Sequence, residues 1–132
     1  MNLNFNSPVP IYQQMVDEVK KALARGELSP GDKIPSLKER AQMSKVNPNT
    51  VQRAYQEMER EGLTETLRGQ GTFIRNDPAL LVQIRTEMAQ AAVRQFIGEM
   101  RELGLQTEEI ERILRSQLYT GNGEGQDDAH GA

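Results

Sequence analysis

The fold of this chain is decided by residues 35–74, whose sequence is PSLKERAQMSKVNPNTVQRAYQEMEREGLTETLRGQGTFI. Two helix starts lie close together in its first half. Ser36 and Glu39 form a capping box, in which the serine hydroxyl accepts from the amide three residues on and the glutamate reaches back to the serine amide. Asn47 and Pro48 are the second start, because asparagine accepts from an otherwise unpaired amide and proline at the first helical position has no amide to lose.

The distance between these starts sets the lengths of the elements. The first helix must be short, about residues 36–43, which leaves 44–46 as a tight turn of helix-turn-helix length. The second helix is predicted from Pro48 to Glu61, and Gly62 is its C-terminal stop. The spacing therefore predicts a helix-turn-helix.

The second half of the stretch has the pattern of a β-hairpin. Residues 64–67 and 72–75 are short and rich in β-prone side chains. Gly69-Gln70 between them fits a two-residue turn whose first central residue has a positive φ. We expect Ile34 to add a short strand that pairs with this hairpin. A hairpin directly after the second helix of such a motif is a wing.

The two helix starts, the second helix and the hairpin follow one another in an order and spacing that resemble the DNA-binding domain of GntR-family transcriptional regulators. The run from Asn47 to Val51, with the short C-terminal extension, is similar to the YtrA-like subfamily. Arg40, Ser44 and Lys45 depart from the pattern, because family members usually carry Leu, Leu and Gly there. The first helix of the motif is therefore more polar than the resemblance implies.

Three regions are predicted along the chain: a winged helix-turn-helix in residues 1–76, a helical hairpin in 77–119 and a disordered tail in 120–132. A helix at about residues 10–25 has apolar residues three and four apart and is expected to pack on the motif. Asp77-Pro78 opens a long helix to about Leu103, and a second amphipathic helix follows Gly104. The tail is Gly-rich and acidic, without large apolar residues. The predicted fold class is α+β, mainly α.

Composition excludes several classes of protein. The 132 residues include no cysteine and one histidine, which rules out disulfides, thiolate catalysis and Cys-based zinc sites. No nucleophile has a nearby base, so we expect neither an enzyme nor a bound cofactor or metal. No run approaches the roughly 18 apolar residues of a membrane span, and the first residues lack the pattern of a signal peptide. We therefore expect a cytoplasmic chain that makes no membrane contact.

Charge is unevenly distributed along the chain. A net charge of −3 is unusual for a nucleic-acid binder, whose affinity comes largely from neutralised phosphates. Residues 1–76 carry 11 Lys and Arg against 9 Asp and Glu, whereas residues 77–132 carry 5 against 10. Between residues 38 and 56 the count is 4 against 1. The positive charge is therefore concentrated on the predicted DNA-binding motif.

Polar residues of the second helix and the wing are candidates for contact with DNA. The amides of Asn49 and Gln52 can contact base edges in the major groove and favour adenine, while Arg53 can bind guanine or phosphate. The resemblance implies a DNA-contacting basic residue at Lys38, where we expect a lysine to contact backbone more than bases. The candidate DNA-binding residues are Ser36, Lys38, Asn47, Asn49, Thr50, Gln52, Arg53, Arg68, Gly69 and Gln70.

Part of this set has a simpler explanation. Helix capping alone would account for Ser36 and Asn47, and turn geometry alone would account for Gly69. Arg68 supplies positive charge where the wing is expected to approach the groove next to the one that the second helix enters. Both explanations can hold together for the glycine.

A single winged helix covers few base pairs, so we expect a homodimer on a two-fold symmetric, double-stranded operator, with the helical hairpin as the dimer contact. The resemblance implies a transcriptional repressor. The C-terminal region is too small to enclose a metabolite within one subunit, so a small-molecule effector would bind at the dimer interface. The alternative is a winged-helix module for protein-protein assembly without sequence-specific DNA binding. The basic excess between residues 38 and 56 argues against that alternative.

Overall fold

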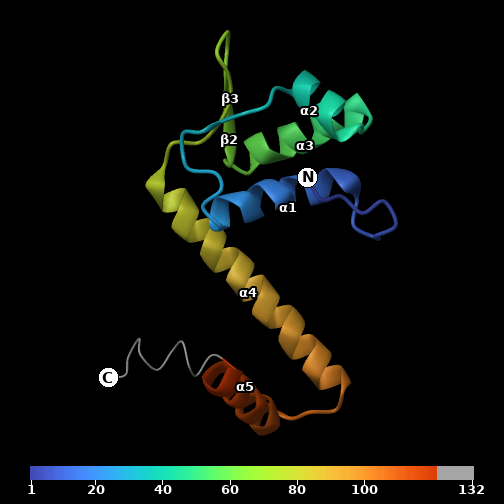
Figure 1. Ribbon diagram of the computed structural model, residues 1–132, viewed down its shortest axis with the longest axis vertical. Helices are drawn as coiled ribbons and strands as arrows, with labels where there is room; N and C mark the ends of the chain where they lie inside the picture. The colour runs from blue at the N-terminus through green and yellow to red at the C-terminus, as the bar shows by residue number, and fades with distance from the viewer. Residues whose placement is uncertain (122–132) are drawn as a thin grey trace. The chain divides into compact units, whose positions relative to one another are not determined.

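The computed structural model describes residues 1–121, which form five helices and three strands (Figure 1). In chain order these are α1 (Ile11–Ala24), β1 (Lys33–Ile34), α2 (Leu37–Ser44), α3 (Pro48–Arg60), β2 (Thr64–Leu67), β3 (Gly71–Ile74), α4 (Pro78–Glu102) and α5 (Thr107–Gly121). They separate into two compact units, Met1–Glu87 and Met88–Ala132, and the second is described as far as residue 121. A mainly helical chain with one small antiparallel sheet confirms the predicted fold class.

The core of the first unit lies where the apolar faces of α1 and α3 meet. Both helices place apolar residues three or four apart, as the sequence pattern predicts. The buried residues are Met15, Val16, Val19 and Leu23 on α1, with Val51, Ala54 and Met58 on α3. Full burial of a large apolar side chain contributes roughly 1.5–3 kcal/mol, so this contact holds α3 firmly against α1.

The two predicted helix starts have the expected hydrogen bonds. The hydroxyl of Ser36 accepts from the amide of Glu39 at 3.1 Å, and the Glu39 carboxylate accepts from the amide of Ser36 at 2.8 Å. Asn47 Oδ1 accepts from the amide of Asn49 at 2.8 Å, which caps α3. Between the helices, Lys45 has a φ of 55°, in the left-handed region that favours glycine. The glycine that the resemblance implies at this position would adopt such a φ without strain.

The wing is part of a three-stranded antiparallel sheet with the order β1-β3-β2. Ile34 pairs with β3, as expected. The predicted two-residue turn is wrong: Leu67 pairs with Gly71, which leaves a three-residue loop at 68–70. The strand β3 begins at Gly71, one residue earlier than expected, and Gly71 has a φ of 127°. Gly69, with a φ of 79°, supplies the expected positive φ in the loop.

The first turns of α4 belong to the first unit. The Asp77 carboxylate accepts from the amide of Ala79 at 3.0 Å, and Leu80 and Ile84 are buried. Arg85 Nε donates to the carbonyl of Ala24, the last residue of α1, at 2.9 Å. The compact unit therefore continues past residue 76, where the sequence placed the end of the DNA-binding domain. The functional division at that residue stays a prediction.

The second unit consists of the rest of α4 and α5. Gly104 has a φ of 86° in the connection, and the Glu109 carboxylate accepts from the amide of Gln106 at 3.0 Å just before α5 begins. The predicted tail, residues 120–132, lies outside the described residues except for its first two positions, which complete α5. Because α5 continues to Gly121, it also passes residue 119, the predicted end of the helical region.

Candidate nucleic-acid interface

A groove of about 670 Å³ lies between α3, the start of α2 and the wing. Figure 1 shows these elements next to one another in the first unit. The predicted DNA-binding residues that line it are Ser36, Gln52, Arg68, Gly69 and Gln70. The fold therefore brings residues of the second helix and the wing, which are far apart in sequence, to one surface.

The other predicted residues lie outside this groove. Lys38 is exposed on α2, and Asn49 is exposed on the first turn of α3. Thr50 is half-buried, and its amide donates to the carbonyl of Asn47 at 2.9 Å. The Asn47 side chain is occupied by its capping bond. Asn49 is thus the amide side chain at this end of α3 that is exposed and not used as a cap.

Arg53 lies on the side of α3 that faces α1. Its guanidinium carbon lies 4.0 Å from the centre of the Tyr12 ring, in a cation-π contact. Its Nη2 is also 3.5 Å from the Tyr12 hydroxyl, at the outer limit for a hydrogen bond. Arg53 therefore contacts α1, whereas its neighbour Gln52 lines the groove.

Tyr55 fixes the start of α2 relative to α3. Its hydroxyl donates to the carbonyl of Pro35 at 2.6 Å, directly before the helix cap at Ser36. Burial raises the pKa of Tyr55, and hydrogen bonding to Arg40 opposes this effect. The hydroxyl therefore stays protonated at neutral pH and remains a donor that sets one wall of the groove.

Several charged residues of the first unit neutralise one another. Arg60 pairs with Glu57 within α3, and this hydrogen bond lowers the pKa of Glu57 to about 2. Lys20 pairs with Glu61 at 2.7 Å between α1 and the end of α3. Lys38 and Arg68 belong to none of the ion pairs found in residues 1–121. Both are therefore available to phosphate.

Two groove residues on α3 escaped the sequence analysis. Gln56 and Glu59 line the groove together with Gln52. They follow Gln52 by four and seven positions, the spacing of one helix face, so periodicity could have identified them. Gln56 extends the amide surface along the groove, whereas Glu59 adds a negative charge at its far end.

Residues 1–121 contain neither a helix suited to crossing a membrane nor a group of side chains suited to binding a metal. No helix there combines the length and apolar character needed to cross a membrane. No three His, Cys, Asp or Glu side chains of that part of the chain are grouped as metal ligands.

Residues 11–74 match the family described as "Bacterial regulatory proteins, gntR family". The chain is 46% identical to the uncharacterized HTH-type transcriptional regulator YhcF of Bacillus subtilis, over 83% of this chain and 91% of that protein. It is 39% identical to the HTH-type transcriptional repressor YtrA of the same organism, over 83% of this chain and 85% of that protein. A solved GntR family transcriptional regulator from Listeria monocytogenes superposes with a TM-score of 0.75 at 34% identity, covering 84% of this chain and 97% of that one.

These likenesses extend over the winged helix-turn-helix and most of the C-terminal helices, since they cover more of the chain than the family match does. The likeness to YtrA supports the predicted YtrA-like subfamily. The fold contains the two helix starts and the wing in the order predicted from the sequence. The chain belongs to the GntR family of bacterial transcriptional regulators.

Proposed function

We propose that this DNA-binding transcriptional regulator is a homodimeric repressor that binds a two-fold symmetric operator. In each subunit α3 enters the major groove and the wing contacts the adjacent groove. The groove between α3 and the wing carries this proposal, because amide side chains and an arginine without an ion pair in residues 1–121 share one surface. The repressor role follows the name of YtrA, and a cytoplasmic location follows from the position of bacterial operators.

We assign the predicted residues to two roles. Asn49 and Gln52 contact base edges, since exposed amides offer a donor and an acceptor to adenine. Lys38 and Arg68 contact phosphates, because neither has a carboxylate partner in residues 1–121. Arg53 contacts backbone at the edge of the surface, where Tyr12 holds its guanidinium.

Ser36, Asn47 and the wing loop support these contacts through the backbone. The capping bonds at Ser36 and Asn47 orient the first amides of two helices, and helix N-termini favour nearby phosphate. Thr50 supports the first turn of α3. Gly69 and Gln70 allow the wing backbone to come close to the sugar-phosphate chain.

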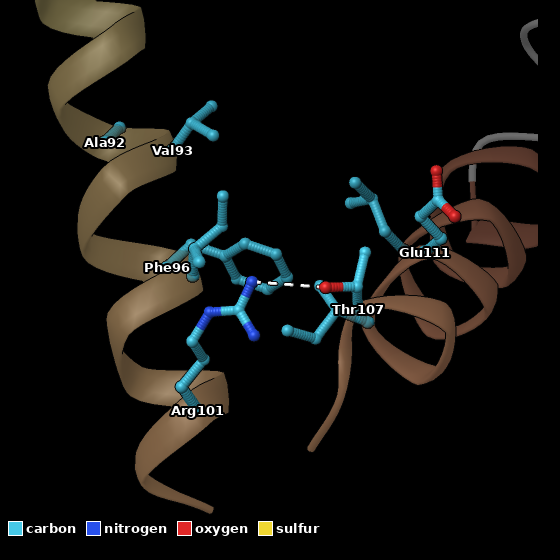
Figure 2. Close-up of a pocket in the computed structure, with 9 residues that line it drawn as sticks. Ala92, Val93, Phe96, Arg101, Thr107 and Glu111 are labelled. Carbon is cyan, nitrogen blue, oxygen red and sulfur yellow. Dashed lines mark hydrogen bonds between the residues drawn. The ribbon is translucent and has the colours of Figure 1, made fainter. Parts of the chain in front are cut away.

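The second unit is proposed as the dimer contact. Figure 2 shows Ala92, Val93 and Phe96 on α4 facing α5 across an apolar pocket of about 360 Å³. Leu114 of α5 also lines it and is 40% exposed, while Val93 is 53% exposed. A second copy of these helices would cover this apolar surface, and helix pairs of this kind associate through such stripes.

We place a small-molecule effector at the same interface. The pocket walls are apolar, and Arg101 lies at the rim, where its Nη2 donates to the Thr107 hydroxyl at 3.3 Å (Figure 2). Glu111 lies on the opposite side of the same pocket. A ligand that changed the packing of α4 on α5 would change the dimer, and with it the spacing of the two recognition helices.

The test is DNA binding combined with a measurement of mass. A duplex is selected from a random library, and its affinity is compared with that of a scrambled duplex of the same composition. We expect tighter binding to the selected duplex and two chains per duplex in sedimentation. Equal affinity for both duplexes would favour the assembly-module alternative, and one chain per duplex would overturn the dimer.

A further inference from the structure

Lys33 of β1 extends its side chain along the wing toward the loop at residues 68–70. Its backbone pairs with Phe73, and Gly71 lies two residues nearer to the loop on the same face of the sheet. A Cβ atom on Gly71 would stand 2.7 Å from Lys33 Cε and 3.4 Å from Nζ. The lysine stem therefore lies across the glycine, in the space that a side chain would otherwise fill.

Lys33 is exposed, and no carboxylate of residues 1–121 forms an ion pair with it. Hydrogen bonding with Ser36 and, to a smaller extent, the charge of Lys33 lower the pKa of Glu39, but Lys33 and Glu39 form none of the ion pairs of residues 1–121. Glu65 shares the face of the sheet, but the lysine extends away from it toward Gly71.

Arg68 places a second cation at the same end of the hairpin. It follows Leu67, whose partner across the ladder is Gly71. Lys33 thus approaches the wing loop from β1, and Arg68 is the first residue of that loop. A lysine whose stem already lies on the sheet has less rotamer entropy to lose when its ammonium group binds phosphate than a fully free lysine has.

We propose that Lys33 is a phosphate-contacting residue of the wing, with its stem positioned over Gly71. The inference rests on the proposed contact between the wing and DNA and adds a residue to it. It also gives Gly71 a second role besides its backbone conformation, since its missing side chain leaves room for the lysine.

The experiment uses the full chain and salt titrations with the selected duplex and a scrambled one. Lys33→Met keeps the apolar stem and removes the charge, while Lys33→Arg keeps a charge. Lys21→Met is the control for loss of one lysine charge away from the wing, because Lys21 lies on α1, is 46% exposed and pairs with Glu18 at 3.6 Å. Loss of one phosphate contact should lower the slope of log affinity against log salt by about 0.9 per subunit, or about eightfold in affinity at roughly 0.1 M salt.

We expect Lys33→Met to show this loss on both duplexes, and Lys33→Arg and Lys21→Met to bind like the wild type. A Lys33→Met slope equal to that of Lys21→Met would overturn the inference while leaving DNA binding intact. A wild-type chain with no preference for the selected duplex would instead overturn the proposed operator binding.

Neutral methylphosphonate linkages, placed one at a time in the selected duplex, locate the contact. At one backbone position we expect neutralisation to weaken the wild type but not Lys33→Met, because the variant has already lost that interaction. If every linkage affects both proteins equally, Lys33 does not contact phosphate.

Discussion

In the first unit the apolar faces of α1 and α3 cover each other, and Met15 and Met58 are each 1% exposed. In the described part of the second unit, α4 and α5 have apolar residues at similar spacing, yet Val93 and Leu114 remain 53% and 40% exposed. Among residues 88–121, one apolar residue is buried, and it is Ile110. An amphipathic pattern thus predicts that a helix has a partner, but it does not tell whether the partner lies in the same chain.

This difference in burial predicts that the stability of the two units depends on different factors. The first unit closes its core within one chain, so we expect it to fold without a partner. In the proposed dimer, the second unit buries its exposed apolar surface by association, so its stability should depend on protein concentration. Variants that affect one unit without the other test this division.

The largest effect is expected from two truncations of the chain. A chain that ends at Glu87 keeps Leu80 and Ile84 and should be a folded monomer. A chain that ends at Asp77 loses both side chains, which at roughly 1.5–3 kcal/mol each makes it about 3–6 kcal/mol less stable. Urea denaturation and sedimentation check both chains. Equal stability of the two would place the end of the first unit at residue 77, and a dimeric longer chain would remove the proposed role of the second unit.

The next largest effect is expected from a charge placed in the apolar pocket, which should affect association of the second unit and leave the first unit unchanged. Leu114→Glu is expected to weaken the dimer by at least the roughly 1.5–3 kcal/mol of apolar burial that the leucine loses there. Binding to a two-site operator should weaken, while thermal unfolding of the first unit stays unchanged. Ser116→Glu, an exposed position of α5, is the control with the same charge. Sedimentation at several concentrations measures the effect, and a Leu114→Glu dimer as stable as the control would place the dimer contact elsewhere.

Within the first unit, specificity and affinity should respond to different residues. Asn49→Ala should cost about 1–3 kcal/mol on the selected operator and little on unrelated DNA, because it removes a contact to a base edge. Lys38→Ala and Arg68→Ala should weaken both duplexes alike and lower the salt slope. Equal losses for Asn49→Ala on both duplexes would show that bases are recognised elsewhere, and the wing would be the next place to look.

The smallest effect concerns the turn between α2 and α3. Lys45→Gly should stabilise the first unit by about 1 kcal/mol, because it relieves a left-handed residue at a φ of 55°. Thermal melting of the full chain detects such a change, and the second unit should be unaffected. Lys38→Gly, inside α2, serves as a contrast that should destabilise by a similar amount. A loss of stability in Lys45→Gly would mean that the lysine makes a contact worth more than the backbone strain.

Local signals made most of the first unit predictable. The capping box of Ser36 and the Asn47-Pro48 pair act within three residues, so the sequence alone contains the whole interaction. Arg53 shows the limit, because periodicity placed it on the exposed part of α3 but could not reveal its contact with Tyr12, 41 residues away. Lys33 was missed for the same reason, since its position depends on the pairing of two strands.

The hydrogen bond from Arg85 to the carbonyl of Ala24 has a consequence for the chain during its synthesis. This bond joins residues 61 positions apart, and it closes the end of α1 with a side chain of α4. At about 5–20 residues per second, a ribosome adds Arg85 about 3–12 s after Ala24. Late in that interval, once residue 74 has been added, the nascent chain contains the whole helix-turn-helix and wing, but it still lacks Leu80, Ile84 and the Arg85 side chain that bonds α1. Regulatory activity should therefore begin only after α4 has left the ribosome, even though every predicted DNA contact is made earlier in the sequence.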